Sequence, residues 1–243
     1  MARTQSKNYP EVRESILKSA AKLFAAKGYP DTTILDLANA CNSSRGALYH
    51  YFDSKEQILI EILNSHLETV LSELQTIAAA EHEPMAAFRA LMRRLMRMNS
   101  QNQAEQITLL NEMNQLDPQT RAKVTQMQKQ IVDLVTDALS GLDDCGRMTP
   151  ENRKVYGMML LGALNYTYVW YDPAGPIAPE TYADMTVDAF IAGFGKPPVG
   201  APLPRAGADV GKRHGTSARP NPETSAAGKG ARREKHQTRN EIV

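Results

Sequence analysis

The chain has 243 residues, of which 42% are hydrophobic and 23% charged, and this suits one sizeable core with a small appended module. Its two cysteines, Cys41 and Cys145, are too few for a secreted disulfide scaffold and lack a zinc-ligand spacing, so we expect a cytoplasmic protein. The net charge of +1 hides an asymmetry, because residues 1–55 hold eight Lys/Arg against five Asp/Glu and residues 197–243 hold nine against four. The middle is therefore acidic overall, and such segregation suits a molecule that presents one end to DNA.

No segment of the sequence predicts export or membrane insertion. The N-terminal residues MARTQSKNYPEVRE contain no apolar region of the kind found in signal peptides. The most apolar stretch, residues 155–171, is shorter than the roughly 20 residues that a bilayer span needs, and it contains Asn165 and Thr167. We expect it to form a helix buried in the centre of a bundle, and we expect no membrane partner.

Helical periodicity runs to about residue 195 without a convincing two-residue alternation, so we predict an all-α fold. A first helix is expected over Pro10–Lys27, ended by Gly28, and a short second helix after the Thr32–Thr33 pair. A third short helix, RGALYHYF (residues 45–52), follows the CNSS turn, and a fourth, longer one covers about 54–80. The fourth helix has one apolar stripe, formed by Leu59, Leu63, Leu67, Val70, Leu74 and Ile77.

Prolines divide the rest of the helical region. Pro84, Asp117–Pro118 and Thr149–Pro150 each predict the start of a further helix. Gly141 and the DDCG sequence that follows it predict a connection, and a last helix is expected over about 179–193.

The C-terminal segment differs in composition from the rest of the chain. From Gly195 onward it is rich in Pro, Gly, Ala and basic residues and has almost no aromatic ones. It cannot bury enough apolar surface to offset its ordering entropy, so 196–243 is predicted to be a disordered basic tail. The tail either holds DNA nonspecifically or serves only as a solubilising extension.

Residues 13–59 carry the most informative pattern, in which two short helices separated by a tight turn stand between a first helix and a long one. This is helix-turn-helix architecture, whose second helix enters the major groove of DNA. Asn42 lies where the turn needs a left-handed backbone, which Asn tolerates well. Ser44, which we include among the DNA-binding residues, is placed to cap the recognition helix.

The recognition helix supplies the other candidate DNA contacts. Arg45 lies in its first turn, where a side chain can reach base edges and preferably guanine, and Tyr49 and His50 flank it along the groove. Lys55, at the start of the fourth helix, and Thr33, which caps the second, are placed to meet phosphates. The alternatives are that Tyr49 packs against the first helix and that His50 is an ordinary surface histidine.

At Ile16–Leu59 the sequence ILKSAAKLFAAKGYPDTTILDLANACNSSRGALYHYFDSKEQIL resembles the TetR family of repressors. GALYHYF followed by SKE is highly specific when it stands behind LFAAKGY and TT at this spacing. The resemblance implies an all-helical homodimer with a DNA-binding domain over 1–56 and a divergent ligand-binding and dimerisation domain over 57–195. It also implies an interface made by the last two helices of each chain, roughly 149–171 and 179–194.

Two positions depart from the family pattern. The family usually has Gly where this chain has Asn42, and an aliphatic residue where it has Ser43. Asn42 can still make the turn, whereas Ser43 removes an apolar contact from the small core.

A second resemblance covers residues 165–194, NYTYVWYDPAGPIAPETYADMTVDAFIAGF. Through its Trp-Tyr, Pro, Gly-Pro and acidic-aromatic spacing, this segment is similar to the last two helices of a branch of the family that senses acyl-CoA thioesters. The resemblance implies an acyl-CoA effector.

Methionines and aromatic residues supply the candidate ligand pocket, although Met suits an ordinary core equally well. Whether the aromatic members line the pocket or the dimer seam stays open. Arg89, Arg93 and Arg97 recur every four residues, which is typical of a solvated basic face, and the alternative is a patch that meets the phosphates of CoA. The predicted ligand-binding residues are Met92, Met96, Met113, Asn165, Tyr166 and Trp170.

Together these features predict a transcriptional repressor that binds operator DNA as a homodimer and is released by a small-molecule effector, with an acyl-CoA thioester as the first candidate. A drug-sensing efflux regulator of the same family and an effector-independent DNA-binding accessory protein are the alternatives. The sequence contains no nucleophile elbow, phosphate loop, dinucleotide fingerprint or cluster of metal ligands. We therefore expect no enzymatic activity, no cofactor and no metal site.

Overall fold

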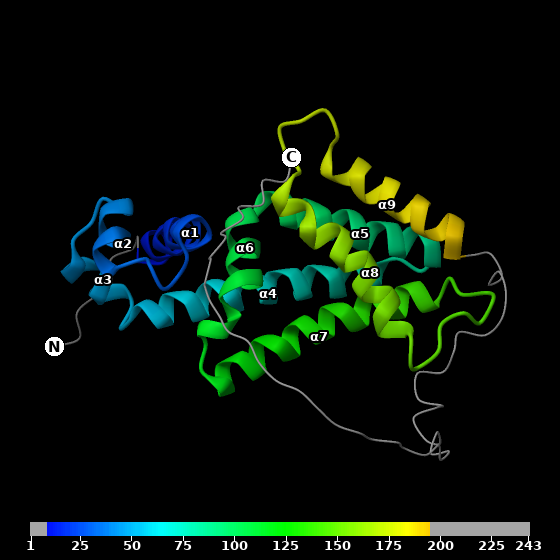
Figure 1. Ribbon diagram of the computed structural model, residues 1–243, viewed down its shortest axis with the longest axis horizontal. Helices are drawn as coiled ribbons and strands as arrows, with labels where there is room; N and C mark the ends of the chain where they lie inside the picture. Colours follow the sequence, from blue (N-terminus) through cyan, green and yellow to red (C-terminus); the bar gives the residue numbers. More distant parts are fainter. Residues whose placement is uncertain (1–8, 195–243) are drawn as a thin grey trace, which may run out of the picture. The chain divides into compact units, whose positions relative to one another are not determined.

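The computed structural model describes residues 9–194, and within that range every regular element is a helix (Figure 1). The prediction of an all-α fold is confirmed. The predicted disordered tail, 196–243, lies outside the described residues. In the described part of the chain, no helix has both the length and the hydropathy that a membrane crossing needs.

The first three helices, α1 (Tyr9–Lys27), α2 (Ile34–Ala40) and α3 (Arg45–Tyr51), follow closely from local sequence. Gly28 ends α1 with a φ of +86°, and Asn42 makes the turn between α2 and α3 with a φ of +48°, as its residue type predicts. Together with the start of the next helix, these helices bury an apolar centre made of Ile16, Ala20, Phe24, Leu37, Leu48 and Phe52.

Helix α4 (Lys55–Ala80) links this N-terminal region to the rest of the chain. Its 26 residues make it about 39 Å long, at 1.5 Å per residue. The helix packs against α1, α5, α6 and α7 (Figure 1). Its predicted apolar stripe is buried as far as Leu74, and Ile77 is half-buried.

Helices α5 (Pro84–Gln101) and α7 (Pro118–Ser140) begin at the predicted prolines, and Glu83 and Asp117 cap their first turns. The sequence does not reveal the break between α5 and α6 (Gln103–Glu112), because no Pro or Gly is near it. The backbone leaves the helical conformation at Asn102, with φ −114° and ψ 45°. A short 3-10 helix, η1 (Met113–Gln115), follows α6.

Helix α8 (Arg153–Asn165) is shorter than the predicted 149–171 segment. It does not begin at Thr149–Pro150, because Asn152 first closes a turn: its Oδ1 accepts from Thr149 N at 2.7 Å and its Nδ2 donates to Arg147 O at 2.9 Å. After α8 the chain continues as the 3-10 helix η2 (Tyr166–Val169). The last described helix, α9 (Pro179–Phe194), agrees with the prediction and packs mainly on α5.

Candidate DNA-binding face and ligand cavity

Helix α3 presents an exposed polar face. Arg45, Tyr49 and His50 are all exposed, and Tyr49 keeps 52% of its surface free. About half of the Tyr49 surface is therefore available for contact with DNA. The ring of His50 lies edge-on to Tyr9 of α1 at 6.1 Å between centroids, a contact that orients it. These three side chains stay the predicted base-reading set.

Two side-chain hydroxyl groups cap the N-termini of the two short helices, α2 and α3. Ser44 Oγ accepts from Ala47 N at 3.1 Å, as predicted for a cap. Thr33 Oγ1 accepts from Asp36 N at 3.1 Å, and Asp36 accepts in return from Thr33 N at 2.8 Å, which completes a capping box. Hydrogen bonds from Lys27 and from Thr33 hold the pKa of Asp36 well below its ordinary value. Contact of Ser44 and Thr33 with phosphates stays a prediction.

Lys55 has a structural role that its sequence position does not indicate. Its Nζ donates to Tyr29 O at 2.7 Å and to Thr32 O at 2.8 Å, and it lies 4.1 Å from the centroid of the Tyr29 ring. Burial lowers the pKa of this ammonium group. Lys55 therefore fixes the loop between α1 and α2, and its predicted phosphate contact has at most one ammonium hydrogen left.

A cavity of about 530 Å³ opens between helices α4, α5, α6, α7 and α8. Its floor is buried and mostly apolar, whereas its rim carries exposed side chains that include Thr125, Lys129, Lys154 and Met158. Arg153 and Asp133 are half-buried in the wall, so the charged lining residues are three cations and one carboxylate. The apolar lining comprises Leu67, Val70, Leu95, Leu109, Leu110, Ile131, Val132, Pro150, Met158 and Leu161.

Four uncharged polar side chains from four helices meet in the wall of this cavity, and we call them the amide cluster: His66, Asn99, Gln106 and Asn165. His66 Nε2 and Gln106 Oε1 are 3.0 Å apart, and Gln106 Nε2 donates to Asn165 Oδ1 at 3.3 Å. Asn99 Nδ2 donates to the same oxygen at 3.2 Å. His66, Asn99 and Gln106 are only 6%, 8% and 6% exposed. Burial lowers the pKa of His66, so its imidazole is neutral at neutral pH.

Of the six predicted ligand-binding residues, Asn165 alone lines the cavity. Met92 and Met96 are completely buried in the core, and Met113 is half-buried outside the lining. Tyr166 and Trp170 are 61% and 54% exposed, so they lie on the outer surface and not in the cavity. Five of the six predicted residues therefore lie outside this cavity, and their ligand-binding role stays a prediction.

Sequence reasoning missed the other three members of the amide cluster. His66, Asn99 and Gln106 are not among the ligand-binding residues predicted from the sequence. The signal that could have identified these residues is a polar side chain on the buried face of a helix. Gln106 is an example, because it lies on the buried side of α6 with Thr108 and Leu109.

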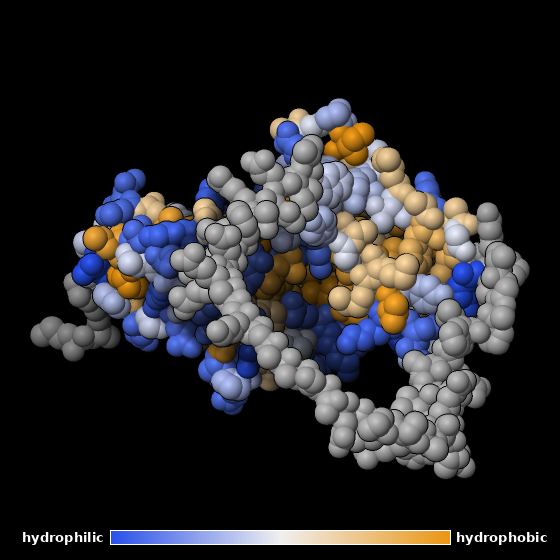
Figure 2. Space-filling view, in the orientation of Figure 1, coloured by the Kyte–Doolittle hydropathy of each residue, from blue (hydrophilic) through white to orange (hydrophobic). Residues whose placement is uncertain are grey.

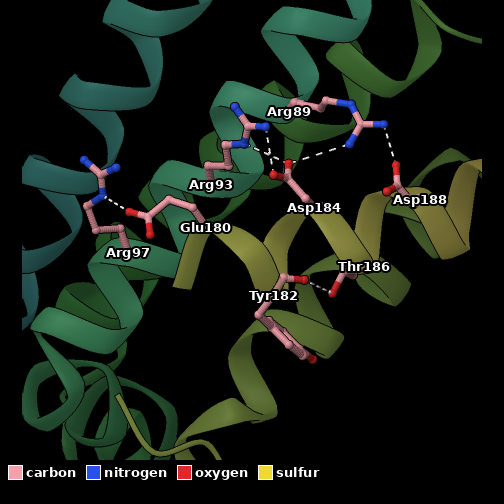
Figure 3. A network of polar contacts seen from close by, with 8 residues as sticks. All are labelled: Arg89, Arg93, Arg97, Glu180, Tyr182, Asp184, Thr186 and Asp188. Carbon is pink, nitrogen blue, oxygen red and sulfur yellow. Dashed lines mark hydrogen bonds and ion pairs between the residues drawn. The ribbon is translucent and has the colours of Figure 1, made fainter. Parts of the chain in front are cut away.

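Arg89, Arg93 and Arg97 of α5 are neither a free basic face nor a phosphate patch, because they pair with carboxylates of α9 (Figure 3). Arg93 donates to both carboxylate oxygens of Asp184, at 2.7 and 2.8 Å. Arg89 contacts Asp184 and Asp188, and Arg97 contacts Glu180. Both sets recur every four residues, so they form a ladder that attaches α9 to α5.

A buried carboxylate joins the cavity helices to the helix-turn-helix. Glu112, the last residue of α6, is 7% exposed, and its Oε1 accepts from Tyr29 N at 3.1 Å. The loop that it holds is the one that Lys55 binds from the other side. Helix α6 also packs along α1 (Figure 1). A displacement of α6 would therefore act directly on the position of α1 and α2.

Comparison with known proteins agrees with this arrangement. The profile of "Bacterial regulatory proteins, tetR family" matches residues 16–62, and that of "Tetracyclin repressor-like, C-terminal domain" matches residues 81–194. The transcriptional repressor KstR2 of Mycolicibacterium smegmatis is 28% identical over 194 residues, covering 75% of this chain and 90% of that protein.

Two solved structures extend the similarity to three dimensions. A TetR-family transcriptional regulator from Bordetella parapertussis is 30% identical, with a TM-score of 0.72 over 74% of this chain and 94% of its own. AibR, solved in complex with isovaleryl coenzyme A and operator DNA, is 28% identical, with a TM-score of 0.64 over 73% and 97% of the two chains. The chain belongs to the TetR family of transcriptional regulators.

Proposed function

We propose that the protein is a transcriptional repressor that binds operator DNA as a homodimer and releases it when an acyl-CoA thioester enters the cavity. The observation that carries this proposal is that α4 and α6 both line the cavity and hold the helix-turn-helix. A ligand between these helices can therefore change the position of the DNA-reading helix.

The DNA-binding half of the proposal uses the exposed face of α3. Arg45 reads base edges from the first turn, and Tyr49 and His50 extend the contact along the groove. Thr33 and Ser44 cap the N-termini of α2 and α3, and in the proposed complex the partial positive charge of these N-termini would favour phosphate.

The homodimer is supported by an apolar surface on the last helices. Figure 2 shows hydrophobic side chains gathered over α8 and α9. Large apolar side chains left exposed on α8, η2 and α9 are Val155, Met158, Met159, Tyr166, Val169, Trp170 and Met185. Apolar patches of this kind favour burial against a partner, and a two-fold axis there would set the spacing of two recognition helices at about 34–36 Å or a multiple of it.

The effector class is supported by the charge and polarity of the cavity. Lys129 and Lys154 suit the phosphates of a CoA moiety, whereas Arg153 is already paired with Asp137. The apolar floor suits an acyl chain. The similarity to AibR, whose structure contains isovaleryl coenzyme A, supports the same class. With three cations against one carboxylate, Asp133, the lining favours an anionic effector over a cationic drug.

Release requires the effector to bind one arrangement of the helices more tightly than the other. Helix α6 is the shortest route, because Gln106 and Leu109 line the cavity and Glu112 holds the loop before α2. An effector that displaces α6 changes the separation of the two recognition helices in the dimer, and operator affinity falls with it.

The test is a gel shift of the purified protein on its own upstream intergenic DNA, with a panel of acyl-CoA thioesters and a panel of cationic and aromatic drugs. We expect a sequence-specific shift that one class of thioester reverses. Arg45→Ala with Tyr49→Ala should abolish the shift, whereas Lys123→Ala, which removes an exposed cation of α7, should preserve it.

Three outcomes would count against the proposal. An equal shift on random DNA would show that binding is nonspecific, and a shift that survives the double substitution would refute the assignment of the DNA-reading residues. Release by drugs with the thioesters inert would replace the acyl-CoA effector with a drug.

A further inference from the structure

The amide cluster has hydrogen-bonding groups that no protein atom satisfies. Asn165 Oδ1 accepts from both Gln106 and Asn99, so the Nδ2 group of Asn165 is turned away from them. Within the described residues, neither this Nδ2 group nor Asn99 Oδ1 has a hydrogen-bond partner, and Gln106 Nε2 uses only one of its two N–H groups.

These free groups face the cavity. Among the buried side-chain nitrogen and oxygen atoms of the described residues, only Arg147 Nε is both sealed off and without a partner. Asn165 Nδ2 and Asn99 Oδ1, the two atoms without a partner, therefore retain some solvent access, and both residues line the cavity. Water can satisfy them while the cavity is empty, but a ligand that displaces the water must supply its own partners.

The charge of the amide cluster restricts what those partners can be. All four side chains are neutral, and burial keeps the imidazole of His66 uncharged. Lys154 and Asn165 lie on the same face of α8, eleven residues apart, which places them about 16 Å apart along the helix. A carboxylate at the amide cluster would be buried against four neutral side chains, which is unfavourable, and a bare hydrocarbon would leave the amides unpaired.

We propose that the effector carries an uncharged oxygen, in a ketone or hydroxyl group, on the part that reaches the deep wall of the cavity, and that Asn165 and Gln106 hydrogen-bond to it. The inference rests on the proposed function only in taking this cavity as the effector site. It assigns to the cavity a preference for oxygen-bearing over saturated ligands of the same shape.

Three ring compounds of nearly equal size test the preference without assuming a thioester: cyclohexane, cyclohexanol and cyclohexanone. Each is titrated into the full-length, nitrogen-15-labelled protein while the side-chain amide signals of Asn165 and Gln106 are followed by NMR. We expect the two oxygen-bearing compounds to shift these signals and to bind about tenfold more tightly than cyclohexane, or better.

Two variants show whether the discrimination comes from the amide cluster. Asn165→Leu combined with Gln106→Leu removes both proposed donor groups at similar volume, and the preference for the oxygen-bearing compounds should then fall. Asn111→Leu, which replaces an exposed amide of α6 outside the cavity, should leave the discrimination unchanged. The comparison of the three compounds on the unmodified protein does not depend on the folding of either variant.

Equal binding of the three compounds by the unmodified protein, or undiminished discrimination in the variant with both Asn165→Leu and Gln106→Leu, would overturn the inference. A second experiment separates it from the proposed function: release of operator DNA by hexanoyl-CoA and by 3-hydroxyhexanoyl-CoA. If neither thioester releases DNA while cyclohexanol and cyclohexanone still discriminate, the acyl-CoA proposal fails and the amide cluster stands. If both release DNA equally and the ring compounds bind equally, the acyl-CoA proposal stands and the inference fails.

Discussion

The contact between α7 and α8 leaves no room for a side chain at Gly157. A Cβ atom built there would lie 2.3 Å from Cγ2 of Thr136, far inside the distance at which two carbon atoms meet. Thr136 is 1% exposed, and its Oγ1 donates to Asp133 O at 3.0 Å and accepts from Arg153 Nη2 at 3.1 Å. Rotation of Thr136 would break both bonds, so Gly157→Ala should strain the interface.

The expected cost follows from two opposing terms. Overpacking a buried contact costs about 1–3 kcal/mol, and a separation this short argues for the upper end of that range. Replacing Gly by Ala inside a helix returns about 1 kcal/mol. The free energy of unfolding should therefore fall by about 2 kcal/mol, and in a chain of this size the melting temperature should fall by about 4–8 °C.

Chemical denaturation of four proteins checks the reasoning: the unmodified chain, Gly157→Ala, Thr136→Ser and the double variant. Thr136→Ser removes the Cγ2 methyl group that clashes but keeps the Oγ1 that makes both hydrogen bonds. In that background Gly157→Ala should be neutral or stabilising. Equal stability of Gly157→Ala and the unmodified chain, or the same loss in both backgrounds, would refute the predicted clash.

Three further predictions concern other contacts. Glu112→Leu leaves Tyr29 N without its acceptor, so the free energy of unfolding should fall by about 1–3 kcal/mol in urea, and the effector should release operator DNA less completely in gel shifts. The hydrogen bond from Arg93 lowers the pKa of Asp184 from its ordinary value of 3.8, so the stability from this pair is present above about pH 4 and is lost as the pH falls through the lowered pKa. Asp184→Asn should therefore reduce the loss of stability between about pH 4 and pH 2, by less than about 1 kcal/mol because the pair is partly exposed. Met159→Asp, on the exposed apolar face of α8, should convert dimers to monomers in sedimentation experiments.

Each of these predictions has a result that contradicts it. For Glu112, the Glu112→Gln variant keeps an acceptor oxygen, and an equal loss in both variants would show that the hydrogen bond is not the cause. If Asp184→Asn loses as much stability between about pH 4 and pH 2 as the unmodified protein does, the ion pairs between α5 and α9 add nothing to stability. A Met159→Asp protein that sediments as the unmodified protein does would place the dimer interface elsewhere.

Much of the fold was predictable because its signals are local. The ends of α2 and α3 depend on Thr33, Asn42 and Ser44, each of which acts through its own backbone conformation or through a hydrogen bond to a residue within three positions. The prolines that open α5 and α7 act in the same way. The break at Asn102 was not predictable, because no local residue type requires it.

The candidate sites also differ in whether local sequence or tertiary packing determines them. The exposed face of α3 follows from helix periodicity, so sequence reasoning finds Arg45, Tyr49 and His50 without knowledge of the tertiary structure. The amide cluster brings together residues up to 99 positions apart in sequence, from four helices. The carboxylate partners of Arg89, Arg93 and Arg97 lie 83 or more positions away. The sequence by itself determined most of the helices, their caps and the exposed face of α3 that we predict to read DNA, because those depend on neighbours within a few residues. Only the tertiary structure decided which polar side chains meet in the cavity and which charges pair, because both depend on how distant helices pack.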